Sequence, residues 1–278
     1  MAEISSQMVK NLRERTGVGM AKCKEALVEA AGDIDLAISN LRKAGMASAV
    51  KKESREANEG IISFFESEKA IVLVEVNAET DFVVKNALFQ SFAQEIAEEI
   101  CTTAPSSVET FVKQKSKKDK EHTIDERRAL LIQTLGENIQ VKRFKLFPKK
   151  SNHSLAVYSH AGGKLVTLVE IVGSSKEAPL AKDIAMHIAA ESPEYLSKDD
   201  VPQTVLEHER EIARAQVQNK PANIVDKIVD GKLKAYYVQA CLLYQPFVKD
   251  TSMTIEQLVT SKGSELKVIQ FLRWRVGE

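Results

Sequence analysis

Residues 60–76 read G-I-I-S-F-F-E-S-E-K-A-I-V-L-V-E-V, in which two runs rich in Ile, Val and Phe flank a short polar turn. This pattern predicts a β-hairpin. From residue 154 the chain repeats the plan with S-L-A-V-Y-S-H-A-G-G-K-L-V-T-L-V-E-I, and both copies end in L-V-E-V or L-V-E-I. A helical pattern follows each hairpin, at residues 92–100 and 181–190. The sequence therefore predicts an α+β fold with duplicated α+β core subdomains.

The connection between hairpin and helix differs between the two copies. The first copy has N-A-E-T-D-F-V-V-K-N at residues 77–86, where the second has G-S-S-K-E-A-P. Because the scaffold repeats and this segment does not, the segment is a functional candidate. Two interpretations of Phe82 stay open from the pattern alone. It either packs under the helix at 87–101, or it protrudes as an anchor that enters a partner protein, with Asp81 beside it as a fixed acceptor.

The first 45 residues predict a small bundle of helices. Apolar residues at i, i+4 spacing begin at Ile4, and this first helix ends at Gly17-Val18-Gly19. A second helix starts at Met20, and Asp33 is a suitable N-cap for a third. We therefore predict a three-helix domain at 1–45, followed by a charge-rich and partly helical linker at 46–59, where no clear apolar face is seen.

The remaining chain divides into three predicted parts. Core subdomain 1 covers residues 60–147, and core subdomain 2 is formed by 148–196 together with 232–278. Between the two segments of subdomain 2, residues 197–231 predict an inserted antiparallel helical coiled coil, because the apolar stripe of its first arm, 207–216, is too narrow for a globular core. Its helices would meet at a turn, Asn219-Lys220-Pro221. The expected core positions are Val205, Ile212 and Val217 before the turn and Ile224, Ile228 and Leu233 after it.

Composition argues against several classes of protein. The chain has 278 residues with 39 Lys and Arg and 39 Asp and Glu, so its net charge is zero. Nucleic-acid binders usually carry a basic excess, so the balanced charge argues against that class, and we interpret the lysine run 113–120 as a solvated face. The chain has no leader pattern and no long apolar window, which predicts a cytoplasmic protein without a membrane span. Its scattered Cys23, Cys101 and Cys241 are expected to be reduced.

Motifs of nucleotide, metal and nucleophile chemistry are missing from the sequence. Gly162-Gly163-Lys164 is followed by Leu165 in a hairpin turn, so it is not a phosphate-binding loop. The five histidines show no i, i+4 pairing with each other or with cysteines, although His160 and His187 could still meet in the fold. We therefore predict no catalytic residues, no cofactor and no metal site, and hence a protein that is not an enzyme.

Four collinear segments carry a resemblance to a known family: L-R-E-R-T-G-V-G-M-A-K-C-K-E-A-L (12–27), V-E-V-N-A-E-T-D-F-V-V-K-N (74–86), H-I-A-A-E-S-P-E-Y-L (187–196) and C-L-L-Y-Q-P-F-V-K-D (241–250). In this order they resemble the elongation factor Ts family of bacteria. The resemblance covers essentially the whole chain. It implies a ubiquitin-associated-like N-terminal domain, two similar α+β subdomains and an inserted antiparallel coiled coil.

The resemblance also implies a function in translation elongation, as a guanine-nucleotide exchange factor for the GTPase elongation factor Tu. By similarity, Phe82 would enter the GTPase beside its Mg²⁺ site, with Thr80 and Asp81 shaping the turn and Val83 packing behind. GDP would then leave, and the complex would persist until GTP binds. The chain itself need bind neither nucleotide nor metal.

A second contact is implied for the N-terminal domain, where Arg13, Val18 and Met20 would dock on the same domain of the GTPase. Two alternatives stay open. The chain could be a ubiquitin-associated-like interaction adaptor without exchange activity, and its coiled coil could pair with a second copy to form a homodimer.

Overall fold

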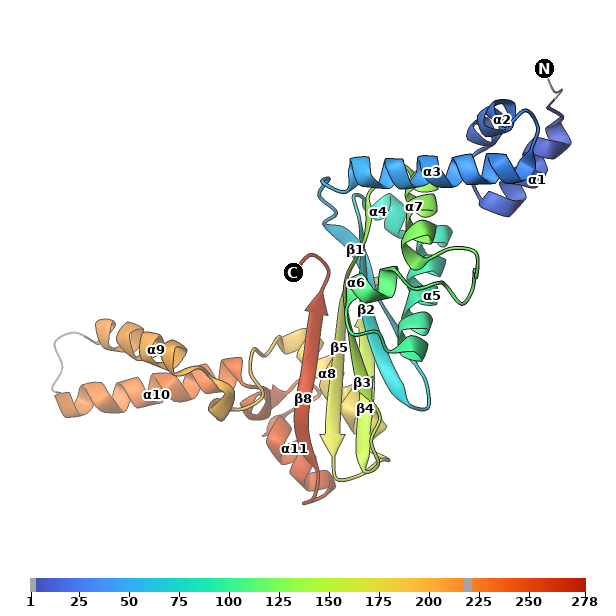
Figure 1. The fold of residues 1–278 in the computed structure, drawn as a ribbon. Helices are drawn as coiled ribbons and strands as arrows, with labels where there is room; N and C mark the ends of the chain where they lie inside the picture. The colour runs from blue at the N-terminus through green and yellow to red at the C-terminus, as the bar shows by residue number, and fades with distance from the viewer. Residues whose placement is uncertain (1–3, 218–221) are drawn as a thin grey trace. The chain divides into compact units, whose positions relative to one another are not determined.

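The chain folds into two compact units that are each built from helices and antiparallel strands. The computed structural model describes residues 4–217 and 222–278. Unit 1 comprises Met1–Pro148, Gly162–Lys164 and Arg275–Glu278, and unit 2 comprises Lys149–Ala161 and Leu165–Trp274. Figure 1 labels the elements of both units. The predicted α+β class is confirmed, because each unit combines helices with an antiparallel hairpin.

Unit 1 begins with helices α1 (Ser6–Thr16), α2 (Met20–Glu29) and α3 (Ile34–Lys52). Their ends agree with the sequence signals. Gly17 ends α1 in the left-handed conformation with φ 69°, and the Asp33 carboxylate caps α3 by accepting from the backbone N–H groups of Asp35 and Leu36. The helices enclose a core of small and aliphatic side chains, which includes Val9, Leu12, Val18, Cys23, Leu27, Ala37 and Leu41.

Helix α3 runs past residue 45, the predicted end of the first domain, into the linker that was predicted to be partly helical. It continues through Lys52, so residues 46–52 are helical and only the rest of 46–59 connects to the sheet. A Cβ on Gly45 would lie 3.2 Å from Gln133 Oε1 and 3.6 Å from the Ala129 carbonyl oxygen, both on α7 (Ile124–Leu135). Ala49 is also buried. The buried face of α3 here consists of small residues, which a search for large apolar side chains overlooks.

The sheet of unit 1 has the strand order β1-β2-β3, all antiparallel: β1 (Glu59–Glu66), β2 (Ala70–Ala78) and β3 (Ile139–Pro148). The predicted hairpin is confirmed, with Glu66 opposite Ile71 and Ile61 opposite Val76. Strand β3 was not predicted. Its charged residues Lys142, Arg143 and Lys145 interrupt the apolar alternation, as is common in a strand at the edge of a sheet.

Helix α5 (Ala87–Thr103) packs on this hairpin and supplies the centre of the unit 1 core. Its predicted apolar face is confirmed, because Phe89, Phe92, Ile96 and Ile100 are all buried. Every residue of β2 is buried as well. The short helices α4 (Asp81–Val84) and α6 (Val108–Val112) complete the unit together with α7.

Unit 2 repeats the order of hairpin and helix. Strands β4 (His153–His160) and β5 (Leu165–Val172) pair antiparallel, helix α8 (Ala178–Glu191) packs on both, and β8 (Lys267–Arg275) joins next to β5. The turn that carries Gly162-Gly163-Lys164 connects β4 and β5, as predicted. A small hairpin and a helix follow the α8 region: β6 (Pro246–Phe247), β7 (Asp250–Thr254) and α11 (Ile255–Lys262).

The tetrapeptides L-V-E-V in β2 and L-V-E-I in β5 each bury their glutamate. Glu75 in β2 is 0% exposed and Glu170 in β5 is 2% exposed. The counter-groups differ, because Arg143 Nε lies 2.7 Å from Glu75 Oε2, whereas His153 Nδ1 lies 2.6 Å from Glu170 Oε1. A buried carboxylate needs such partners. Both copies of the scaffold thus keep a buried glutamate, but the side chain that pairs with it differs.

Helices α9 (Gln203–Ala215) and α10 (Ala222–Ala240) pack antiparallel in unit 2, because early Leu206 clusters with late Tyr237, and late Ala213 with Val229. Helix α10 extends past residue 231, where the predicted insert ends. The predicted turn at Asn219-Lys220-Pro221 lies outside the described residues. Among the expected core positions, Val217 and Leu233 are buried, Val205 and Ile228 are half-buried, and Ile212 and Ile224 are exposed.

The exposure of Ile212 and Ile224 has a packing reason. The contact between the two helices uses Ala213 and the partly buried Val225, which are one residue removed from Ile212 and Ile224 respectively. A small residue such as Ala213 lets the helix axes approach, and this rotates the larger neighbour outward. The sequence periodicity indicated two helices correctly but assigned the contact to the larger side chains.

Two kinds of feature are absent from the part of the chain that the structure describes. None of its helices is long and apolar enough to cross a membrane. No group of His, Cys, Asp and Glu side chains there is arranged to hold a metal ion. His187 is buried, with Nε2 3.0 Å from Gln245 Oε1, and burial lowers its pKa despite that hydrogen bond. His160 instead is exposed beside the Tyr158 hydroxyl.

Candidate functional site

The segment after β2 forms one helical turn, α4, rather than an irregular turn. Thr80 is its N-cap, with extended backbone (φ −129°, ψ 157°), and Thr80 Oγ1 accepts from the Val83 backbone N–H at 3.4 Å. A threonine in this position satisfies a donor that the first turn of a helix leaves free. Asp81 follows as the first helical residue, where a negative charge is favourable.

Two carboxylates fasten this turn to the segment that leads into β3. Glu137 accepts twice from Thr80, through Oε2 from the backbone N–H at 2.9 Å and through Oε1 from the hydroxyl at 2.6 Å. In return, Glu79 Oε1 accepts from the Asn138 backbone N–H at 2.6 Å. Each segment therefore places a carboxylate on the backbone of the other. We call these contacts of Glu79, Thr80, Glu137 and Asn138 the clamp.

The charged residue of α4 is paired within its own turn. Lys85 Nζ lies 2.7 Å from Asp81 Oδ2, in the i, i+4 order that stabilises a helix. The hydrogen bond from Lys85 lowers the pKa of Asp81, and the same contact raises the pKa of Lys85. The Asp81 side chain thus stays charged and oriented beside Phe82.

The three apolar residues of α4 have different environments. Val83 and Val84 are 9% and 6% exposed and belong to the core of unit 1, whereas Phe82 is 82% exposed. The interpretation that Phe82 packs under helix 87–101 is therefore wrong. Burying a phenylalanine is worth roughly 1.5–3 kcal/mol, and the fold leaves that gain unused at this position. The buried valines fix the orientation from which Phe82 points into solvent.

The N-terminal candidates divide into exposed and buried residues. Arg13 is exposed, and Met20 is 42% exposed at the start of α2. Val18 is fully buried, and its carbonyl oxygen accepts from Cys23 Sγ at 3.3 Å. The side chain of Val18 therefore shapes the loop between α1 and α2 from inside. Only Arg13 and Met20 of this set present their side chains to solvent.

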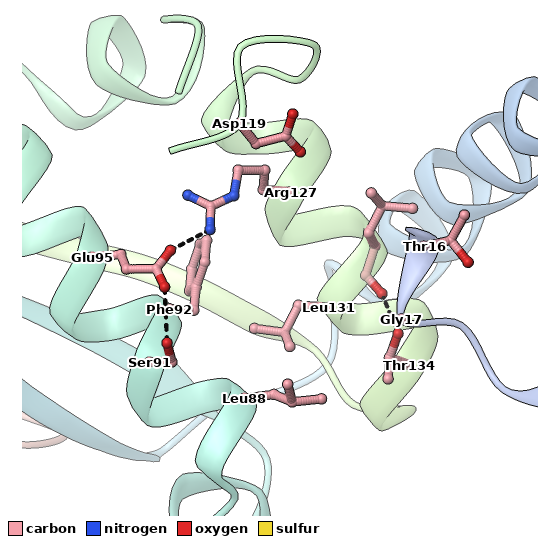
Figure 2. A pocket seen from close by; sticks show the side chains of 11 residues that line it. Thr16, Gly17, Leu88, Ser91, Phe92, Glu95, Asp119, Arg127, Leu131 and Thr134 are labelled. Carbon is pink, nitrogen blue, oxygen red and sulfur yellow. Dashed lines mark hydrogen bonds and ion pairs between the residues drawn. The ribbon is translucent and has the colours of Figure 1, made fainter. Parts of the chain in front are cut away.

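A surface pocket lies between the α1–α2 loop, α5 and α7 (Figure 2). Its volume is about 230 Å³. Gly17 forms one end, and Leu88 stands at the start of α5, directly after the connection from α4. The lining residues are Thr16, Gly17, Leu88, Ser91, Phe92, Glu95, Asp119, Arg127, Leu130, Leu131 and Thr134.

The polar wall of this pocket is satisfied internally. Arg127 pairs with Glu95, donates to Ser116 Oγ at 3.0 Å and lies over the Phe92 ring at 5.9 Å. Figure 2 shows Glu95 between Ser91 and Arg127. Burial acts to raise the pKa of Glu95, but the hydrogen bonds from Arg127 and Ser91 outweigh it, and the pKa is lowered. Glu95 thus stays ionised next to an arginine that is also held in place.

The lysine run 113–120 wraps around another carboxylate of α5, Glu99, which is buried. Glu99 is 3% exposed and accepts from Ser116 Oγ at 2.6 Å and from the Lys117 backbone N–H at 2.9 Å. The lysine side chains point to solvent, which confirms the predicted solvated face. The exposed lysines are Lys113, Lys115, Lys117, Lys118 and Lys120.

Sequence patterns missed the clamp and the pocket. Glu137 follows Gly136, the left-handed residue that ends α7, so locally it reads as a loop residue. Its partner Thr80 lies 57 positions earlier, and no local periodicity relates them. Leu88 was part of a helix prediction, but its 52% exposure follows only from the packing of α5.

Comparison with known proteins identifies relatives along the whole chain. The sequence profile of the family described as "Elongation factor TS" matches residues 79–278. A protein named Elongation factor Ts from Protochlamydia amoebophila (strain UWE25) is 56% identical over 282 residues, covering 100% of both chains. The proteins of that name from Chlamydia muridarum and Chlamydia felis are 44% and 42% identical over 281 residues, again covering 100% of both chains.

Proposed function

Because this chain belongs to the elongation factor Ts family of translation elongation factors, we propose that it binds the GTPase elongation factor Tu and promotes release of GDP. It acts by binding, not as an enzyme, and needs no cofactor of its own. We also propose a cytoplasmic location, where translation takes place. The observation that carries the proposal is the exposure of Phe82, 82%, on a helical turn that is fastened by the clamp.

A rigid, exposed aromatic side chain is suited to entering another protein. Thr80 and Glu137 hold α4 before any partner arrives, so little conformational freedom is lost on binding. Val83 anchors the turn in the core, and Asp81 presents a charged acceptor next to Phe82. We propose that Phe82 enters the GTPase beside its Mg²⁺ site.

The exchange step follows from linkage between two ligands of the GTPase. If this chain binds the nucleotide-free form more tightly than the GDP form, it weakens GDP by the same factor. Phe82 would disturb the Mg²⁺ and phosphate contacts, and the complex would persist until GTP binds. Nucleotide chemistry thus stays with the GTPase.

The N-terminal contact is proposed for the exposed residues of that region. Arg13 and Met20 would touch the same domain of the GTPase, while buried Val18 holds the loop in shape. We also propose that α1–α3 are a ubiquitin-associated-like domain and that α9 and α10 are an antiparallel coiled coil inserted into the second of two duplicated subdomains. The burial of the α1–α3 core and the antiparallel packing of α9 on α10 support these assignments.

The test is release of a fluorescent GDP from elongation factor Tu, followed by stopped flow. Phe82→Ala should lower the maximal release rate by at least about tenfold, which corresponds to about 1.4 kcal/mol in the activation free energy of release. The matched control is Phe64→Ala, because Phe64 is also exposed, at 37%, on β1 of the same unit. Unchanged release with Phe82→Ala would remove Phe82 from the mechanism. Binding by the wild type without any acceleration would favour the adaptor alternative.

A further inference from the structure

Two residues that line the pocket of Figure 2, Gly17 and Leu88, lie close in sequence to Met20 and Phe82, which the proposed function assigns to the GTPase. Gly17, at one end, directly precedes the Val18–Met20 loop, and Leu88, at another, follows α4 by a short connection. We therefore expect a partner that contacts both Met20 and Phe82 to lie next to the pocket. We infer that this pocket receives a large apolar side chain of the same GTPase, an inference that rests on the proposed function.

The chemistry of the lining selects an apolar occupant. Leu88 is 52% exposed at the rim, and Phe92 and Leu131 form an apolar floor. The charged wall already has its partners, because Glu95 is paired with Arg127 and hydrogen-bonded by Ser91 at 2.8 Å. The second acid, Asp119, accepts from the Glu121 backbone N–H at 3.1 Å and lies 2.6 Å from His122 Nδ1. A lysine or glutamate from the partner would lose its hydration here and gain no free charge in return. A leucine, isoleucine, methionine or phenylalanine would gain contact without that loss.

The size of the pocket gives a second reason for filling. An interface that covered about 230 Å³ and left it empty would contain a cavity, and cavities weaken packing in proportion to their volume. Anchors of this kind, seated in a pocket and surrounded by a polar rim, contribute most of the affinity in many interfaces. The pocket would therefore act as a second anchor point beside Phe82, with the direction reversed: the partner supplies the side chain.

The two anchors should affect different quantities. Phe82 is proposed to act on the Mg²⁺ and phosphate contacts, so it changes the maximal rate of GDP release. The pocket lies on α5 and α7 and would bind the GTPase equally with or without nucleotide. Such uniform binding changes the concentration at which the effect is half-maximal and leaves the maximal rate unchanged.

The test uses full-length variants in the same release assay over a range of concentrations. Leu88→Ala should raise the half-maximal concentration by about tenfold and keep the maximal rate within about twofold. The control is Leu36→Ala, since Leu36 is 47% exposed on α3 and does not line the pocket. It should change neither quantity by more than about twofold.

A filling variant tests the pocket from the opposite direction. Ser91 is exposed at the rim, so Ser91→Phe can occupy the pocket without disturbing the core. It should also raise the half-maximal concentration by about tenfold, whereas Ser91→Ala, which loses only the hydrogen bond to Glu95, should change it by less than about threefold. Circular dichroism melting of each variant verifies that it is folded.

The outcomes separate this inference from the proposed function. If Phe82→Ala abolishes acceleration while Leu88→Ala and Ser91→Phe bind like wild type, the pocket inference is overturned and the exchange function stands. If Leu88→Ala lowers the maximal rate instead, the division between the anchors is overturned. Methyl NMR of Leu88 and Leu131 supports the inference if their signals shift on adding nucleotide-free GTPase. Shifts that follow the concentration of this chain alone would identify a second copy as the occupant and overturn it.

Discussion

The two hairpin–helix units share a scaffold and differ in the segment that joins hairpin to helix. In unit 1 this connection is α4, a capped turn that buries Val83 and Val84 and exposes Phe82. In unit 2 it is Gly173–Glu177, where Ser154 Oγ donates to the Ser174 carbonyl oxygen at 2.8 Å and accepts from the Glu177 backbone N–H at 2.8 Å. Both connections are fixed, but only the first fixes a side chain that faces solvent. A fixed connection is thus common to both units, and the exposed aromatic residue distinguishes the copy to which we assign the proposed function.

The largest expected effect is on stability, in the connection of unit 2. Gly173 has φ 111°, and a Cβ there would lie 2.4 Å from the Glu265 carbonyl oxygen. We expect Gly173→Ala to destabilise unit 2 by about 3 kcal/mol or more, because both the conformation and the space exclude a side chain. Urea unfolding followed by circular dichroism measures this. Gly17→Ala is the control, since Gly17 also has positive φ, 69°, but no atom within 4 Å of its Cβ position; it should cost only about 1–2 kcal/mol.

The next effect concerns the connection of unit 1. Glu137→Gln keeps the size of the side chain but weakens two hydrogen bonds of the clamp at Thr80. Hydrogen bonds to a charged group contribute about 1.5–3 kcal/mol, so α4 should fray and GDP release should slow by about tenfold. Glu68→Gln, at an exposed position in the β1–β2 turn, should leave release unchanged. If Glu137→Gln also left GDP release unchanged, the clamp would not be needed to hold α4 in the conformation that promotes release.

The smallest effect is a titration within α4. The pKa of Asp81 is held below its ordinary value of 3.8 by the hydrogen bond from Lys85. A carboxylate with a depressed pKa stabilises the fold above its unfolded pKa, and that contribution is lost as the pH falls through the folded pKa. We therefore expect the contribution at neutral pH and its loss below about pH 4. In Lys85→Met the pKa of Asp81, measured by NMR of its carboxyl group, should move back toward 3.8. A pKa that did not move would mean that Lys85 does not hold Asp81 in solution.

The comparison also explains what the sequence could predict. Hairpins and large apolar helix faces are local patterns, so the β1–β2 hairpin and the buried face of α5 were predicted correctly. Contacts made by small residues were missed at Gly45 and Ala213. The helices pack closely there because these side chains are small, and a search for large apolar side chains does not find them. The edge strand β3 was missed because its charges hide its alternation.

Within the site, the segment containing Phe82 could be singled out because the second copy lacks it. The exposure of Phe82 could not be predicted, because Val83 and Val84 follow it directly, are also apolar and are buried. The partners of Thr80 and the pocket at Leu88 are formed by residues far apart in the chain. Such contacts depend on the tertiary fold and cannot be predicted from the periodicity of the sequence.

The clamp also determines when α4 can become fixed during synthesis and folding of the chain. Thr80 can form its hydrogen bonds only after Glu137, 57 residues later, has been synthesised, and Glu79 likewise needs Asn138, 59 residues later. A nascent chain that has exposed α4 but not yet the end of α7 therefore carries Phe82 on an unfastened turn. Closing a contact over that many residues comes late in folding, because its loop entropy must first be overcome by other interactions. Under the proposed function, the chain would therefore be competent for the GTPase only once the segments around Thr80 and Glu137 have folded together.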